Sequence, residues 1–410
     1  MKHISMSATV LCALSISHSI YADVAEDKNY QLIEAVSQGE VSFRSRLRYE
    51  DANQGLQGAQ ALTLGSKLTY ASQAYQNFFV LLEVNDVTAL PDDENYNSGL
   101  NNQSDDVLVL DPEGTEVNQA WLAYDASNTL FKYGRQSISL NNERLIGGDS
   151  WRQNPQTFAG LTIKNENLNL TRFYLGQLNS VQSVLGSDHD SSANALDAKF
   201  MNLEYRGFWS SKLSVYGLWL NEYASQPNSE TKTYGVRFAG ELGDSEFSLD
   251  YDFSYSNQED AGSNPLNYSA NYSMFELDFG VDEVHMTVGQ EVLGGSKDGY
   301  FVTPLASLHE FQGWTEQFRN QGLGNISGGI QDRYINVKHQ CSEKYSIAAV
   351  YHVYASDNDA TGAGDLGSEW GVEVNAEYEN YGFNLKYADY NRDQFGIDTK
   401  RLWLSSEFRF

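Results

Sequence analysis

Three arginine residues near the start of the chain are spaced two positions apart. Arg44, Arg46 and Arg48 alternate with residues that include the apolar Phe43 and Leu47. A β-strand points successive side chains to opposite faces, so the three guanidinium groups would form one row. A guanidinium holds its donors in a fixed fork that matches a carboxylate, and rings of Arg or Lys favour anions. The spacing therefore predicts a ladder of cations able to bind carboxylate-bearing solutes.

Basic residues also occupy polar positions in later segments. Together with the ladder, these are the candidate solute-binding residues: Lys67, Arg135, Arg152, Arg172, Arg237, Lys386, Arg401 and Arg409. Acidic residues with the same facing are also present: Glu83, Asp250, Asp252, Glu276, Asp278, Glu373 and Glu377. The cations could therefore select anions, or pair with these acids and hold a polar interior together. The sequence leaves both interpretations open, and the face of Arg135 is itself ambiguous.

The segments that carry these residues have one apolar and one polar face. Segments of about 9 to 14 residues with this alternation recur throughout the chain, which is the pattern of β-strands. A face that carries three arginines, as in residues 41–49, cannot be the core of a sandwich. That face must meet water, while the opposite face meets something apolar. Lipid outside and a wet lumen inside satisfy both requirements.

The number and the spacing of the segments predict the architecture. Eighteen segments begin near residues 40, 60, 75, 116, 128, 157, 168, 196, 210, 230, 245, 267, 281, 328, 343, 367, 381 and 399. We expect their connections to alternate strictly between short and long, as periplasmic turns and extracellular loops do in outer-membrane barrels. The predicted fold is all-β, a transmembrane antiparallel β-barrel of about 18 strands that leaves an aqueous channel. A soluble lectin-like or β-helical protein is the alternative, but nothing in such a fold requires short and long connections to alternate.

The amino-terminal residues predict export. Lys2 and His3 precede an apolar run that ends close to Ala22, as in a secretory signal. We therefore expect a signal peptide at 1–22 and a short periplasmic segment at 23–39.

The last segment predicts closure of the barrel. Residues 40–410 would form a single domain, and Leu402–Phe410 ends on an aromatic residue, as the final strand of outer-membrane proteins does. An unpaired edge strand is a liability, so we expect this segment to pair with Val41–Tyr49. The expected location is the outer membrane of a Gram-negative cell. The expected partners there are outer-membrane lipid, lipopolysaccharide and the barrel-assembly machinery.

Other classes of function find little support. A net charge of −28 argues against nucleic acid as a partner. Neither a Gly-x-Ser-x-Gly elbow nor a His-Glu-x-x-His motif is present, so we expect neither catalysis nor a cofactor or metal. His339 and His352 on neighbouring strands, with Ser346 nearby, keep an outer-membrane hydrolase as a distant alternative. Cys341 is interpreted as an isolated thiol.

Several stretches resemble the alginate-export family of outer-membrane proteins. They are Glu116–Leu122, Gly134–Gln136, Gly147–Asn154 and Pro304–Trp314, the last of which keeps a Leu-His-x-Phe-Gln-Gly-Trp run. The resemblance implies an 18-stranded barrel that passes an acidic oligo- or polysaccharide, such as alginate-like uronates, through a basic lumen. It also implies that Arg152 folds into the pore, although its position alone would make it a loop residue. A general diffusion porin without a specific sugar substrate remains the alternative, and transport would be passive.

The longest predicted loop, Leu293–Ser327, contains His309, Phe311, Trp314 and Phe318. Exposed aromatic residues in an outer loop need burial, so we expect the loop to pack into the mouth of the barrel. The aromatic faces could instead stack on sugar rings.

Overall fold

The computed structural model describes residues 32–90, 95–101, 103–192, 195–226, 228–244, 246–358 and 364–410. The predicted signal peptide at 1–22, and residues 23–31 of the predicted periplasmic segment, lie outside the described residues. The remainder of that segment contains one short helix, α2 (Leu32–Ser37). In the described ranges, no helix is long and apolar enough to cross a membrane.

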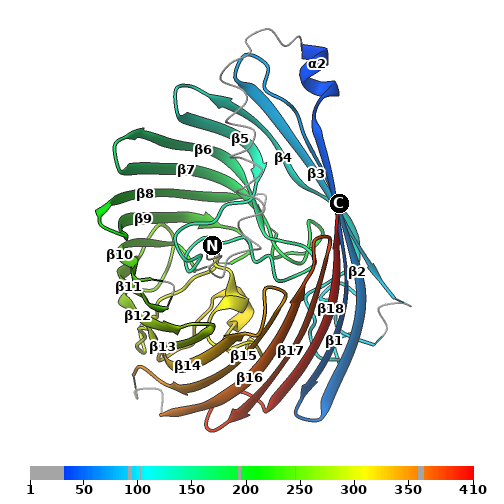
Figure 1. The fold of residues 1–410 in the computed structure, drawn as a ribbon. Helices are drawn as coiled ribbons and strands as arrows, with labels where there is room; N and C mark the ends of the chain where they lie inside the picture. Colours follow the sequence, from blue (N-terminus) through cyan, green and yellow to red (C-terminus); the bar gives the residue numbers. More distant parts are fainter. Residues whose placement is uncertain are drawn as a thin grey trace.

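Eighteen antiparallel strands form one closed sheet (Figure 1). The strands are β1 (Glu40–Gln54), β2 (Gln57–Ala71), β3 (Phe78–Ala89), β4 (Gly114–Asp125), β5 (Thr129–Gln136), β6 (Thr157–Leu168), β7 (Thr171–Gln182), β8 (Leu196–Phe208), β9 (Ser211–Tyr223), β10 (Thr231–Gly243), β11 (Phe247–Asp260), β12 (Ser269–Val281), β13 (Val284–Leu293), β14 (Ile330–Gln340), β15 (Tyr345–Ala355), β16 (Asp365–Glu377), β17 (Tyr381–Arg392) and β18 (Thr399–Arg409). Each strand pairs with its neighbours in sequence, and β1 also pairs with β18. The predicted closure is confirmed, with Arg44 opposite Arg409 and Ala52 opposite Arg401.

The predicted strands agree with the observed ones, and no predicted start differs from the observed start by more than three residues. The expected strict alternation of connections fails at one place. β1 and β2 are joined on the extracellular side by the tight turn Gly55–Leu56, in which Gly55 has a φ of 62°. A glycine adopts this left-handed conformation without a steric cost, so two long strands can be connected here without a loop.

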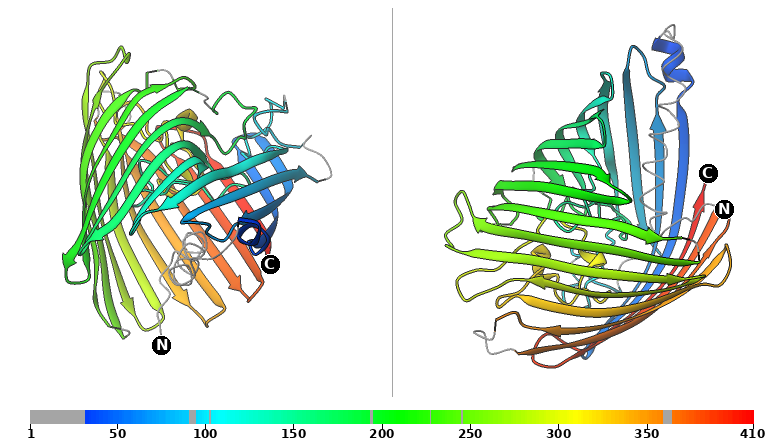
Figure 2. Two further views of the ribbon diagram at one scale, coloured as in Figure 1. Left: turned by 90° about the horizontal axis from the view of Figure 1, so that it is seen from above. Right: turned by 60° about the vertical axis from the view of Figure 1, so that its left-hand side comes forward.

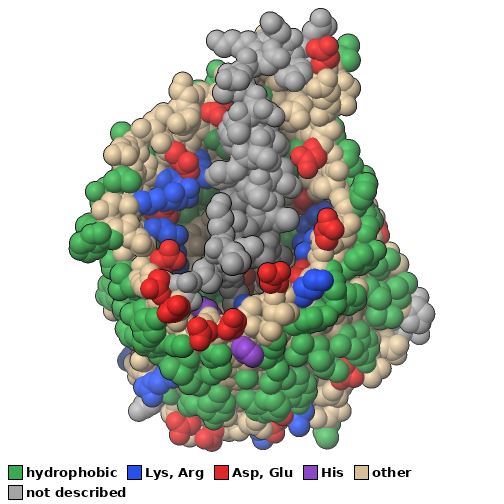
Figure 3. Space-filling view, in the orientation of Figure 1, with side chains coloured by type: hydrophobic (Ala, Val, Ile, Leu, Met, Phe, Trp, Pro, Cys, Tyr) green, Lys and Arg blue, Asp and Glu red, His purple; other side chains and the backbone are tan. Residues whose placement is uncertain are grey.

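The strands run side by side around a closed wall (Figure 2). The two faces of this wall have opposite character, and Figure 3 shows part of it. Outward-facing positions are apolar and exposed, for example Leu47, Phe253 and Val374. Figure 3 shows this apolar outer surface and, around the opening, gathered basic and acidic side chains. Such a wall fits a bilayer, because alternate residues contact lipid while the others face water.

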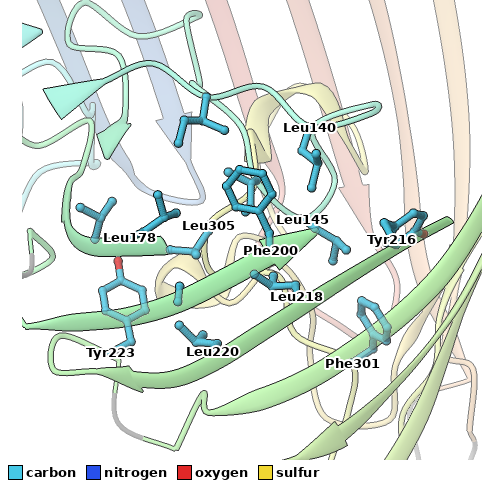
Figure 4. Packing of buried hydrophobic residues seen from close by; sticks show 14 of the residues in the cluster. Leu140, Leu145, Leu178, Phe200, Tyr216, Leu218, Leu220, Tyr223, Phe301 and Leu305 are labelled. Carbon is cyan, nitrogen blue, oxygen red and sulfur yellow. The ribbon is translucent and has the colours of Figure 1, made fainter. Parts of the chain in front are cut away.

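Two extracellular connections fold into the barrel and pack together against its inner wall. These are the 137–156 loop between β5 and β6, and the 294–329 loop between β13 and β14, which contains η1 (Leu308–Glu310) and η2 (Asn320–Gly322). Figure 1 shows the 294–329 loop, in yellow, inside the ring of strands. In Figure 4, Leu145 and Leu305 of the two loops lie with Phe200 and Leu218 of the wall in one apolar cluster. The predicted packing of the longest loop into the barrel mouth is thus observed.

Candidate functional site

The arginine ladder of β1 has three different environments. Arg44 forms an ion pair with Glu407 on the neighbouring β18. Arg48 is buried and lies 3.4 Å from Asp111, with its guanidinium 4.5 Å from the centre of the Trp151 ring. Arg46 contacts only neutral oxygens, including Gln153 Oε1 at 3.0 Å, and forms no ion pair with any described residue. Of the three ladder residues, only Arg46 therefore lacks an ion pair with a described carboxylate.

A buried cluster of charges connects the loops to the wall. Glu50 of β1 lies within ion-pair distance of Arg152 (3.1 Å), Arg48 (3.3 Å) and Arg401 (2.5 Å). Arg152 also reaches Glu316 of the 294–329 loop at 2.8 Å. Although burial alone would raise it, the pKa of Glu316 lies well below its ordinary value because Arg152 stabilises the carboxylate. Arg48, Arg152 and Arg401 thus hold the loops in place.

Lys386 of β17 contacts both loops at once. Its ammonium lies 4.3 Å from the ring centre of Trp151, 4.0 Å from that of Trp314 and 3.3 Å from His309 Nε2. Burial and the charge of Lys386 lower the pKa of His309 to about 3. The imidazole is therefore neutral at pH 7, so Nδ1 donates to Glu316 Oε1 at 2.9 Å while Nε2 accepts from Lys386. Trp151 stacks on the same imidazole at 4.2 Å between ring centres.

The remaining inward-facing candidates lie on several strands, and each has an acidic neighbour. Lys67 lies 3.6 Å from Glu83, and Arg237 binds Asp252. Arg172 lies 2.6 Å from Glu166, while Arg409 pairs with Glu407 and Glu377. These four cations are only partly exposed, and structural pairing describes their contacts in the free protein.

Arg135 is separate from the other candidates. It is two residues from the exposed Tyr133, and β5 pairs with both neighbours without a bulge, so both side chains belong to the outward row. Its guanidinium donates to Val117 O at 3.2 Å and contacts Gln182. The geometry therefore does not place Arg135 with the lumen cations, despite its family-like motif.

Further cations that the sequence did not single out also lie in the interior, one of them the buried Arg144 of the 137–156 loop, which pairs with Glu291. Lys132, Lys164 and Arg206 lie near Arg172 at the periplasmic end of β5 to β8, where Lys164 and Arg206 have acidic partners. Lys132 lies 4.3 Å from the ring centre of Trp121 and forms no ion pair in the described part of the chain. Arg319 in the 294–329 loop likewise forms no ion pair with a described residue. Alternation from Phe131 and Tyr133 could have identified Lys132, whereas an irregular loop gives no such signal for Arg319.

An acidic wall faces the arginine ladder. Asp250 of β11 lies directly opposite Asp278 of β12, and Glu241 of β10 lies opposite Asp250. In a closed barrel of eighteen strands, β10 lies across the lumen from β1. These three carboxylates lie within three residues of the periplasmic end of their strands, whereas Arg46 lies close to the middle of β1. Figure 3 shows basic side chains on two sides of the opening and acidic ones along its rim.

The histidines do not form a common site. His352 faces inward and binds Asp332, with Nδ1 2.9 Å from Oδ1. His339 is exposed in the outward row of Ile335 and Val337, so the two imidazoles lie on opposite faces of the wall. Among the residues that the structure describes, no group of three or more His, Cys, Asp or Glu side chains could hold a metal ion.

Comparisons with known proteins agree with the fold. A family model described as alginate export matches residues 37–264. OccAB4 of Acinetobacter baumannii superposes with a TM-score of 0.72 and 16% identity, over 91% of this chain and 98% of that one. OpdK of Pseudomonas aeruginosa, solved with vanillate, superposes with a TM-score of 0.71 and 13% sequence identity, over 92% of this chain and 99% of OpdK. OccD3 (OpdP) of the same organism superposes with a TM-score of 0.69 and 16% sequence identity, over 92% of both chains. A search of curated proteins found no match.

Proposed function

The chain belongs to the alginate export family and forms an outer-membrane channel, and on that premise we propose that it passively conducts anionic oligo- or polysaccharides of the uronate type. The basic side of the lumen would contact the carboxylates of the sugar. Residues 1–22 would be removed on export, 23–39 would remain on the periplasmic side, and the barrel-assembly machinery would insert residues 40–410. A passive channel serves export and uptake alike.

The observation that carries this proposal is the guanidinium of Arg46, which has no acidic partner among the described residues. Its bonds all go to neutral oxygens, so an incoming carboxylate would not have to displace an existing acid. A planar guanidinium fork suits a uronate carboxylate. Lys132 and Arg319 are two further interior cations without an ion pair in the described ranges, and they extend the path beyond the ladder. We propose that these three residues, rather than the paired candidates, contact the solute most strongly.

A general diffusion porin is the second candidate. The acidic wall of Asp250 and Asp278 supports it, because a lumen with both signs of charge discriminates less strongly between ions. An outer-membrane hydrolase built on His339 and His352 finds less support, since the two imidazoles lie on opposite faces of the wall.

Single-channel recording in planar bilayers tests the proposal. We expect anion preference, and block of the current by oligouronates. Arg46→Gln should weaken block by about tenfold or more, because a hydrogen bond to a charged group is worth about 1.5–3 kcal/mol. Arg237→Gln is the matched control, since it removes the same charge from a residue already paired with Asp252. Equal block in both variants, or cation preference without block in the wild type, would leave a general porin.

A further inference from the structure

The outer wall carries a shallow depression over β12 to β15, away from the lumen. Its volume is about 400 Å³, and its lining side chains include Phe275, Val288, Gln290, Arg333, Ile335 and Tyr351. The register places these residues in two adjacent outward rows. Phe275, Gln290 and Arg333 are consecutive partners in the upper row, and Val288, Ile335 and Tyr351 are consecutive partners in the lower row. The depression therefore has an apolar lower part and a polar upper edge.

Arg333 is the unusual member of this lining. Its side chain is exposed on the lipid-facing row, directly above Ile335 and Val337, which are 41% and 43% exposed. Its guanidinium donates to Gln331 Oε1 at 3.1 Å and forms no ion pair with any residue of the described ranges. Gln331 is itself held by Asp357 Oδ1 at 3.3 Å, so its amide oxygen stays directed at Arg333. A free positive charge thus sits at the top of an apolar strip.

The height of Arg333 identifies the part of the bilayer that it meets. An arginine on the lipid face of a barrel is strongly destabilising at the bilayer midplane and only weakly so near the interface. Arg333 lies three residues from the extracellular end of β14, whereas the apolar Ile335 and Val337 lie deeper. Its neighbour Gln290 on β13 is polar at the same level. The pair therefore marks the headgroup level of the outer leaflet.

An occupant of the depression must have an anionic head at this level and an apolar tail below it. We propose that the depression is a specific site for the phosphorylated glycolipid of the outer leaflet, with a lipid A phosphate on Arg333 and Gln290. An acyl chain lies over Val288 and Ile335, between the rings of Phe275 and Tyr351. The charge of Arg333 is complementary to the phosphate, and no acid of the described ranges forms an ion pair with it. The site is independent of the solute that the lumen conducts.

Native mass spectrometry of the full barrel in detergent micelles tests this proposal, with bisphosphoryl lipid A as the probe. Wild-type protein should retain one lipid A more tightly than lipid A stripped of its phosphates or phosphatidylethanolamine. Arg333→Gln should weaken the binding by about fivefold, since a basic residue near an anionic membrane surface contributes about 1 kcal/mol. Val288→Trp should also weaken it without changing any charge, because the larger side chain fills the apolar floor.

Lys232→Gln is the matched control, because Lys232 is exposed near the extracellular end of β10 and does not line the depression. All variants should keep the heat-modifiable mobility of a folded barrel. Equal losses in Arg333→Gln and Lys232→Gln would overturn the site and leave a general effect of surface charge. Unchanged binding in Val288→Trp, or equal binding of dephosphorylated lipid A, would also overturn it.

Discussion

Arg152 and Glu316 form an ion pair of 2.8 Å between two loops whose partners are 164 residues apart in the sequence. Their side chains are only 1% and 8% exposed. Because Arg152 also binds Glu50 of β1, one guanidinium connects the 137–156 loop, the 294–329 loop and the barrel wall. The two inner loops are therefore joined to each other and to the barrel wall by ion pairs, and they form one packed unit.

Arg152→Gln should weaken the attachment of the 137–156 and 294–329 loops to the barrel wall. Removing one partner of a buried pair costs about 3–5 kcal/mol, because the carboxylates of Glu50 and Glu316 lose a neutralising cation. Hydrogen exchange should accelerate in both inner loops while the strands remain protected, and single-channel currents should become noisier. Arg172→Gln is the control, since its partly exposed pairs with Glu166 and Glu204 contribute about 0–1 kcal/mol. Unchanged exchange in the loops of Arg152→Gln would show that apolar packing alone holds them.

Lys386→Met should loosen the same loops by a different route. The substitution keeps an unbranched side chain but removes a cation that lies over Trp151 and Trp314. Each contact is worth about 0.5–2 kcal/mol, and both are lost together. Proteolysis of the 294–329 loop should be faster, and tryptophan fluorescence should shift towards that of exposed indole. Lys344→Met is the control, because Lys344 lies over Tyr378 near a periplasmic turn. If the 294–329 loop of Lys386→Met were cleaved at the same rate as that of the wild type, the expectation would be contradicted.

Acidification should weaken the docking of the 294–329 loop through His309. The pKa of His309 is lowered from 6.5 to about 3, by burial first and by Lys386 second. The contribution of the neutral imidazole is therefore fully present above pH 6.5 and is lost as the pH falls from 6.5 towards 3. The measurement is the fluorescence of Trp151, which stacks on His309, as a function of pH.

The difference between the pH dependence of fluorescence in the wild type and in His309→Gln gives the contribution of the His309 imidazole. Asp149, whose pKa burial raises to about 6, and Glu310, whose pKa burial raises to about 7, remain in both proteins. His285→Gln should keep the wild-type response, because His285 binds Asp278 elsewhere in the lumen. An identical acid response in His309→Gln would assign the pH dependence to other groups.

Asp250→Asn combined with Asp278→Asn should increase anion preference. The two carboxylates lie directly opposite each other on β11 and β12, across the lumen from the arginine ladder. Removing both carboxylates ends the repulsion between them and also removes the charged acceptor of His285 and Thr287, so the folding of the double variant is checked by its heat-modifiable mobility. The reversal potential in a salt gradient gives the result. Asp282→Asn, in the turn after β12, should leave the potential unchanged. An unchanged potential in the double variant would mean that permeating ions do not sense the acidic wall.

The strand pattern predicted the wall well because inward and outward positions alternate with a period of two. Arg44, Arg46 and Arg48 therefore fell on the correct face, and the closing pair of β1 and β18 followed from the apolar row of the last segment. The large apolar side chain of Trp403 lies in the otherwise polar inward row, because the two inner loops cover it. It packs against Trp151 and His309, with ring centres 5.8 Å and 5.9 Å away.

The contacts made by the loops could not be read from the sequence. Neither Glu50 nor Glu316 was among the acids expected to pair with the lumen cations, yet together they bind Arg48, Arg152 and Arg401. Such contacts depend on how two irregular segments fold against a distant wall, and no periodicity encodes that arrangement. Local periodicity thus identified the faces of the strands, and tertiary packing decided which cations remain free.

The pairing of β1 with β18 also has a kinetic consequence. Arg44 and Glu407, which form an ion pair across this seam, are 363 residues apart in the chain. Contacts of such large sequence separation are slow to form, because the entropy of closing a very long loop is lost before any favourable contact is gained. All other strand pairs join sequence neighbours and can form as local hairpins. The seam is therefore expected to be the rate-limiting step of assembly, so substitutions at Arg44 or Glu407 should slow folding.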